Sequence, residues 1–143
     1  MPLVNKAEEG RSIITEYSKD KVSMPCFCAE NTFTVEGILN GASKVEAEKG
    51  KTITVYIAAM GNYYGRQQLK NYTSLDNTWE GFLAFKRDIE RLCRKDGPFQ
   101  NVQVIPSLDH GQPELDDELF EKGRDFWGCV VLQRHFSSRF SGG

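Results

Sequence analysis

The chain has 143 residues, of which 39% are hydrophobic and 27% charged, and its formal net charge is −2. This composition suits one soluble domain with a real core, or a piece of something larger. Acidic and basic residues are interspersed, so the chain shows no electrostatic footprint for nucleic acid. No apolar run reaches the roughly 18 residues of a membrane helix. We therefore expect neither nucleic acid nor a membrane among its partners.

Four cysteines occur along the chain, at Cys26, Cys28, Cys93 and Cys129. No CxxC spacing is present, which argues against a structural zinc knuckle. The first residues lack a basic leader followed by an apolar core, so they do not resemble a secretory signal. We expect free thiols, buried or half-buried, in the reducing cytoplasm.

Hydrophobic spacing predicts helices and strands that alternate along the chain. Segments with apolar residues at helical spacing are expected to form helices at 5–18, 32–50, 78–95 and 113–123. Short apolar or β-branched runs predict strands at 24–29, 52–58, 102–107 and 127–132. Asn31 or Thr32 can cap the second helix, and Gly50 can end it. The polar connection at 61–77 is longer than most, and connections of this length are often functional.

The repeated strand–helix order predicts an α/β fold with a parallel sheet of βα units and right-handed crossovers. Four such strands could form a small open sheet. They could equally form the first half of a TIM (β/α)8 barrel, which typically needs about 250 residues. Residues 133–143 are basic, Ser-rich and without periodicity, so we expect them to form a disordered tail after a folded unit at 1–132.

The most informative stretch is Leu108-Asp109-His110-Gly111, which comes just past the strand predicted at 102–107. In α/β proteins, ligands bind at the carboxyl edge of the strands. A carboxylate and an imidazole side by side at this edge could combine proton transfer with metal binding. Taken alone, Asp109 could also be an ordinary turn aspartate, and His110 a strand-end histidine held by local hydrogen bonds.

From residue 1 to about residue 130, the chain resembles the class II, metal-dependent ketose-bisphosphate aldolases. The resemblance is carried, in the family's order, by Met1–Asn5, Met24–Phe27, Asn71–Thr73, Leu108–Gly111 and Gly123–Val130. The stretch Leu108–Gly111 is the diagnostic one, because it matches the signature at the end of the family's third strand. The resemblance implies that residues 1–132 form the amino-terminal half of a TIM barrel.

The resemblance also implies a chemistry. Asp109 would be the catalytic acid/base that shuttles the proton at the C4 hydroxyl, and His110 would be one ligand of a catalytic Zn2+. The zinc would polarise the carbonyl of the three-carbon donor. The implied reaction is reversible aldol cleavage of a phosphorylated ketose of the fructose 1,6-bisphosphate type. Members of this family are commonly dimers or larger, so a homo-oligomer is a further expectation.

Two departures from the family pattern affect these expectations. Cys28 stands where family members often carry Asn, and the resemblance stops after Val130. The family's remaining zinc histidines and phosphate-binding loops belong to the second half of its barrel, so we expect no turnover from this chain alone. The other histidine, His135, lies in the unpatterned tail and is not expected to bind the metal. The alternative is a non-catalytic open-sheet domain that binds a small ligand or a protein partner at its strand ends.

Three further groups could lie near the strand ends. Tyr63, Tyr64 and Arg66 could contact a phosphorylated sugar, since Arg suits bidentate phosphate contacts, or could belong to an aromatic-rich loop over the barrel mouth. Glu30-Asn31 is expected to serve only as a helix cap. The acidic cluster at 114–118 is expected to be a solvated first turn favoured by the helix dipole.

Overall fold

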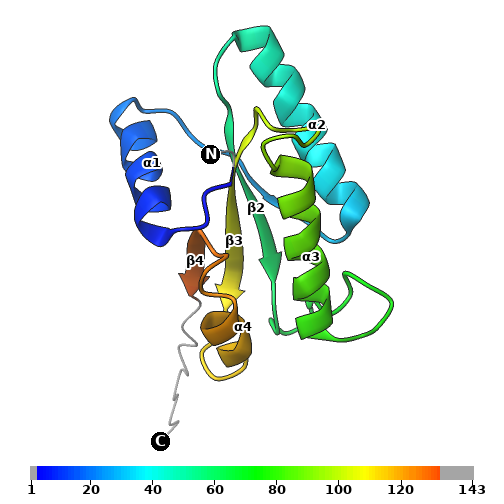
Figure 1. The fold of residues 1–143 in the computed structure, drawn as a ribbon. Coiled ribbons are helices and arrows are strands. Elements are labelled where there is room, and N and C mark those ends of the chain that lie inside the picture. Colours follow the sequence, from blue (N-terminus) through cyan, green and yellow to red (C-terminus); the bar gives the residue numbers. More distant parts are fainter. Residues whose placement is uncertain (1–2, 133–143) are drawn as a thin grey trace, which may run out of the picture.

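Four parallel strands form one open sheet in the order β1-β2-β3-β4, and the computed structural model describes residues 3–132 (Figure 1). The strands are Cys26–Cys28 (β1), Thr54–Met60 (β2), Gln103–Gly111 (β3) and Cys129–Leu132 (β4). The helices are Ala7–Lys19 (α1), Thr32–Lys49 (α2), Thr78–Cys93 (α3) and Asp117–Lys122 (α4). The α/β class and the alternation predicted from the sequence are confirmed. The predicted tail at 133–143, with His135, lies outside the described residues.

Strand order follows chain order throughout the described sheet. A doubly wound sheet reverses its strand order at a switch point, and no such reversal occurs between residues 3 and 132. An open sheet and the first half of a barrel share this sequential order. The assignment to half of a TIM barrel therefore stays a prediction.

The two faces of the sheet carry different helices. Val55, Ile57 and Ala59 of β2 belong to the hydrophobic core that includes buried residues of α2 and α3. Helix α1 lies on the other side of the sheet, as Figure 1 shows, and its Tyr17 hydroxyl donates a hydrogen bond to Thr54 Oγ1 at 3.0 Å. Because side chains alternate along a strand, the sheet has an α2/α3 face and an α1 face.

An aromatic cluster fixes the last strand and the short helix α4 to α3. Its members are Phe82, Phe85, Phe126 and Trp127, with ring centroids 5.2–6.1 Å apart. All four side chains are buried. The Trp127 indole also donates a hydrogen bond to the carbonyl oxygen of Leu119 in α4 at 3.1 Å. Aromatic packing therefore positions the segment that leads into β4.

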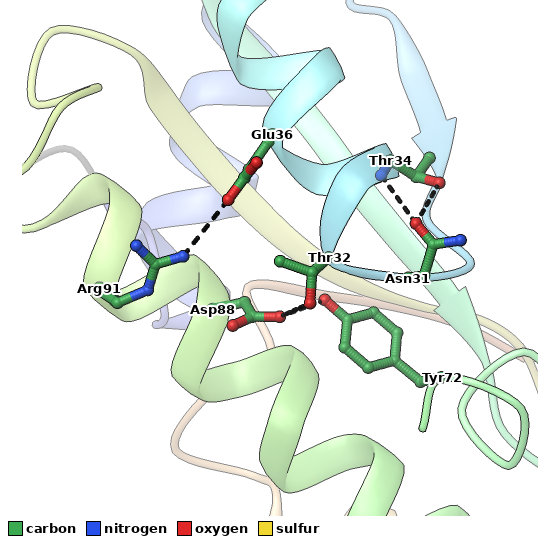
Figure 2. Close-up of polar contacts among 7 residues, drawn as sticks. All are labelled: Asn31, Thr32, Thr34, Glu36, Tyr72, Asp88 and Arg91. Atoms are coloured by element: carbon green, nitrogen blue, oxygen red, sulfur yellow. Dashed lines mark hydrogen bonds and ion pairs between the residues drawn. The ribbon is translucent and has the colours of Figure 1, made fainter. Parts of the chain in front are cut away.

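A buried carboxylate joins α3 to two other parts of the chain (Figure 2). Asp88 of α3 is only 6% exposed, and its Oδ2 accepts hydrogen bonds from Thr32 Oγ1 at 2.6 Å and from the Tyr72 hydroxyl at 2.7 Å. Burial, together with the hydrogen bond to Asp88 and the charge of Asp88, raises the pKa of Tyr72. The phenol therefore stays a donor, and Asp88 holds the start of α2 and the 61–77 loop against α3.

The cap predicted for α2 is confirmed. Asn31 Oδ1 accepts a hydrogen bond from the Thr34 backbone N–H at 3.0 Å, and Gly50 ends the helix with a left-handed φ of 63° (Figure 2). The Arg91–Glu36 ion pair, drawn in the same view, is exposed and 3.5 Å long. Exposed pairs of this kind contribute little to stability.

The two largest differences from the expected element boundaries are four residues each. Strand β3 runs to Gly111 and so includes Asp109 and His110, whereas the prediction ended it at residue 107. Helix α4 starts at Asp117, four residues after the predicted start at Pro113. No helix within residues 3–132 is long and apolar enough to span a lipid bilayer.

Two helical glycines, Gly81 and Gly41, provide a matched test of how the 61–77 loop packs on α3. A Cβ at Gly81 of α3 would overlap the carbonyl oxygen of Leu69, whereas a Cβ at Gly41 of α2 would meet nothing within 4 Å. We expect Gly81→Ala to lower the free energy of unfolding by about 1–3 kcal/mol through overpacking. We expect Gly41→Ala to raise it by about 0.5–1 kcal/mol. Urea denaturation followed by circular dichroism measures both, and equal effects would contradict the packing of the loop on α3.

Candidate functional site

Asp109 and His110 form a β-bulge at the carboxyl end of β3. On the β4 side, Leu108 pairs with Val130 and Gly111 pairs with Leu132, with a register shift between these pairs. Two residues of β3 therefore oppose one residue of β4, and His110 has a φ of 49°. Left-handed backbone is uncommon for a residue other than glycine, and bulges next to active sites re-aim side chains. The sequence predicted the pair just after the end of the strand. In the structure both residues belong to β3, at its carboxyl end.

Strand register places Asp109 on the α1 face of the sheet. Asp109 pairs with Met60, which alternates with the core residue Ala59 and so lies on the opposite face from it. Cys28 shares this face, because it pairs with Ala58, two residues before Met60. Asp109 and Cys28, which are 81 positions apart in the sequence, therefore meet above one surface.

Asp109 contacts its neighbour His110 and the distant residue Cys28. Its Oδ1 accepts a hydrogen bond from the backbone N–H of His110 at 3.0 Å. Its Oδ2 lies 3.8 Å from His110 Nε2 and 3.9 Å from Cys28 Sγ. The side chains of Asp109 and His110 are 21% and 39% exposed, so both remain accessible at this edge. The acid and the imidazole can therefore act on one small ligand.

The 61–77 loop contributes an aromatic ring to the same site. The Tyr63 ring lies 4.7 Å from the His110 ring, at an interplanar angle of 35°. Tyr64 is 96% exposed. Arg66 is exposed and lines a separate polar pocket of about 370 Å³, together with residues that include Glu30 and Gln68. Of the three loop residues proposed from the sequence, the structure brings only Tyr63 into contact with the acid–imidazole pair.

Asp116 is a residue whose role the sequence reading missed. The cluster at 114–118 was expected to be solvated, but Asp116 is fully buried. Its Oδ2 accepts a hydrogen bond from the Gln112 backbone N–H at 2.8 Å, and its Oδ1 accepts one from the Asn62 backbone N–H, also at 2.8 Å. Asp116 therefore ties the loop after β2 to the loop after β3. The only sequence signal for Asp116 was its position before a short helix. The exposed acidic residues beside it share that position, so the sequence did not distinguish Asp116 from them.

The four cysteines are free thiols, but they are not all buried as expected. Cys93 is buried and Cys129 half-buried, whereas Cys26 and Cys28 are exposed. Burial and then the charge of Cys28 raise the pKa of Cys26 to about 11, with a smaller contribution from Asp109. Burial and then the charge of Asp109 raise the pKa of Cys28. The thiols beside Asp109 are therefore protonated at neutral pH and are poor nucleophiles.

A complete catalytic zinc site does not fit the described residues on their own. Catalytic zinc usually takes three protein ligands and leaves one position open. Residues 3–132 contain no group of three His, Cys, Asp or Glu side chains arranged to hold a metal ion. His110 can supply one imidazole, and its neighbour Asp109 one carboxylate.

No protein-family model, curated protein or solved structure matches this chain. The aldolase resemblance therefore depends on the sequence segments alone.

The buried carboxylate of Asp116 gives a stability prediction. Asp116→Asn replaces one acceptor oxygen by an NH2 group that faces backbone N–H donors, which leaves buried polar groups unpaired. We expect it to lower the free energy of unfolding by about 1–3 kcal/mol. Glu118→Gln, in an exposed ion pair with Lys122, should change it by less than about 0.5 kcal/mol. Denaturant titration compares the two, and similar losses would contradict the role of Asp116.

The proximity of Asp109 to Cys28 gives a prediction about thiol reactivity. The Asp109 charge raises the pKa of Cys28, so Asp109→Asn should lower that pKa. Because the thiolate is the nucleophile, Cys28 should then react faster with iodoacetamide at mildly alkaline pH.

Peptide mapping by mass spectrometry gives the rate at which each cysteine reacts with iodoacetamide. Cys93 is the internal control, because burial alone raises its pKa to about 12. An unchanged Cys28 rate, or an equal acceleration at Cys93, would contradict the geometry.

Proposed function

We propose that this chain supplies half of a class II aldolase-type active site, in which Asp109 is the acid/base and His110 is one zinc ligand. The observation that carries the proposal is the acid–imidazole bulge at the carboxyl edge of a parallel βα sheet. The sequential strand order supports the interpretation of this sheet as half of a TIM barrel. The reaction is the reversible aldol cleavage of a phosphorylated ketose such as fructose 1,6-bisphosphate.

Asp109 is suited to proton transfer at a substrate hydroxyl. The His110 backbone N–H occupies its Oδ1, which fixes the carboxylate, while Oδ2 lies toward Cys28 and His110. Removal of the C4 hydroxyl proton by this carboxylate allows the C3–C4 bond to break, so that C4 becomes an aldehyde carbon. The bonding electron pair passes to the three-carbon fragment. The same carboxyl group returns the proton in the condensation direction.

The backbone conformation of His110 and the ring of Tyr63 position the imidazole for ligand binding. The left-handed backbone of His110 at the bulge directs its side chain, and the Tyr63 ring packs beside it. Zinc, when bound, supplies Lewis-acid polarisation of the donor carbonyl. Residues 3–132 hold no group of three such side chains, so a three-ligand zinc site would need ligands from beyond them.

A separate polar pocket beside the strand ends suits a phosphorylated sugar. The polar pocket at the ends of β1 and β2 is lined by charged and amide side chains, with Arg66 as its cation. Arg binds phosphate through paired hydrogen bonds, and amides bind sugar hydroxyls. The four free thiols support a location in the reducing cytoplasm.

Amide chemical shifts of 15N-labelled protein test the proposal. Fructose 1,6-bisphosphate added with zinc should shift the amides of residues 109–111 and of Tyr63. His110→Ala should remove the zinc-dependent part of these shifts, whereas Asp109→Asn should retain it. Mannitol, which has hydroxyls but no phosphate or carbonyl, is the control ligand. Shifts that are absent from this edge, or that mannitol reproduces, would contradict the proposed function.

A further inference from the structure

Gln112 lies just after the bulge and is only 2% exposed. Its side-chain Nε2 donates a hydrogen bond to the backbone carbonyl oxygen of His110 at 3.1 Å. His110 has a left-handed φ of 49°, and such backbone persists in a residue other than glycine only where the surrounding structure holds it. The Gln112 amide is therefore a support for the backbone of His110.

Asp116 in turn fixes the backbone of Gln112. The Gln112 N–H donates a hydrogen bond to Asp116 Oδ2 at 2.8 Å, and the Gln112 carbonyl oxygen accepts one from the Asp116 N–H at 2.9 Å. Both residues are buried, and hydrogen bonds are electrostatically stronger away from water. The side chain of Gln112 therefore starts from a fixed backbone, and its amide reaches His110 from a defined position.

The other oxygen of the same carboxylate fixes a second support of the imidazole. Asp116 Oδ1 accepts hydrogen bonds from the backbone N–H and from Nδ2 of Asn62, both at 2.8 Å. Asn62 directly precedes Tyr63, whose ring lies 4.7 Å from the His110 ring. One buried carboxylate therefore holds both the loop that carries Tyr63 and the residue that carries the Gln112 amide.

We propose that Gln112 is a positioning residue of the candidate site, and that Asp116 acts through it and through Asn62 to hold the His110 imidazole beside Asp109. The proposal rests on the role of His110 in the proposed function. Adjacent residues of a regular extended strand point to opposite faces of the sheet. Without the Gln112 amide, the backbone of His110 returns toward that extended form, and the imidazole turns away from the carboxylate.

Scalar couplings in 15N-labelled protein measure the His110 backbone in the chain without ligand. The coupling between the amide proton and Hα is larger in extended backbone than in left-handed backbone. Gln112→Met keeps the length of the side chain and removes its donor. The His110 coupling should therefore rise toward the extended value, and nuclear Overhauser effects between the Tyr63 and His110 rings should be lost. Gln112→Asn, which keeps an amide but is one methylene too short, should give the same result.

Gln103→Met is the matched control. Gln103 lies at the amino end of β3, and its Oε1 accepts a hydrogen bond from Thr54 Oγ1 at 2.7 Å. The variant removes a comparable bond from the same strand, far from the bulge, so the His110 coupling should stay at its wild-type value. A His110 coupling that stays left-handed in both Gln112 variants, or that changes equally in Gln103→Met, would overturn the proposal.

Ligand titration separates this proposal from the proposed function. Residues that orient a ligand-binding side chain typically change affinity by about 10–100-fold when they are replaced. In the titration with fructose 1,6-bisphosphate and zinc, Gln112→Met should therefore raise the dissociation constant by about tenfold or more. Gln103→Met should leave it unchanged. Wild-type protein that gives no shifts at 109–111 would overturn the proposed function, whereas an unchanged dissociation constant in Gln112→Met would overturn only the positioning role.

Discussion

The parallel ladder between β2 and β3 is the interaction on which the rest of the site depends. It joins seven residue pairs, from Thr54–Gln103 to Met60–Asp109. Because side chains alternate across a strand, a shift of one residue would move Asp109 to the core face. The buried apolar side chains of both strands oppose such a shift. Core packing therefore determines which face of the sheet presents the acid.

The bulge at the end of this ladder brings the side chains of Asp109 and His110 close together. Without it, adjacent residues of a strand would point to opposite faces of the sheet. The left-handed backbone at His110 changes the direction of its side chain. The imidazole Nε2 therefore lies 3.8 Å from Asp109 Oδ2. Such backbone is costly and persists only where the surrounding structure holds it. Asp116 is part of that structure, because it binds the loop that follows the bulge.

Two buried carboxylates have structural roles and flank the candidate site. Asp88 attaches the 61–77 loop and the start of α2 to α3, and Asp116 attaches the loop after β2 to the loop after β3. Each is satisfied by protein hydrogen bonds, as buried polar groups must be. Together they hold the loops around the strand ends, so that Tyr63 can pack on His110.

Much of the fold could be predicted because apolar periodicity is a local signal. The spacing of apolar residues indicated every helix and strand, and Asn31 and Gly50 marked the ends of α2. The bulge could not be predicted, because it arises from pairing between β3 and β4 rather than from the residues of β3 alone. The role of Asp116 and the contact of Cys28 with Asp109 were not predicted, for a related reason. Their partners are distant in the sequence or belong to a loop, and no local pattern encodes such contacts.

Anomalous diffraction at the zinc edge, from crystals of the wild-type chain soaked in zinc, tests whether the Asp109–His110 bulge binds the metal. We expect a peak at the carboxyl end of the sheet, at about 2.0–2.1 Å from a His110 ring nitrogen and with Asp109 adjacent to it. A peak only at other residues, or a sheet in which Asp109 lies on the α2/α3 face, would contradict it.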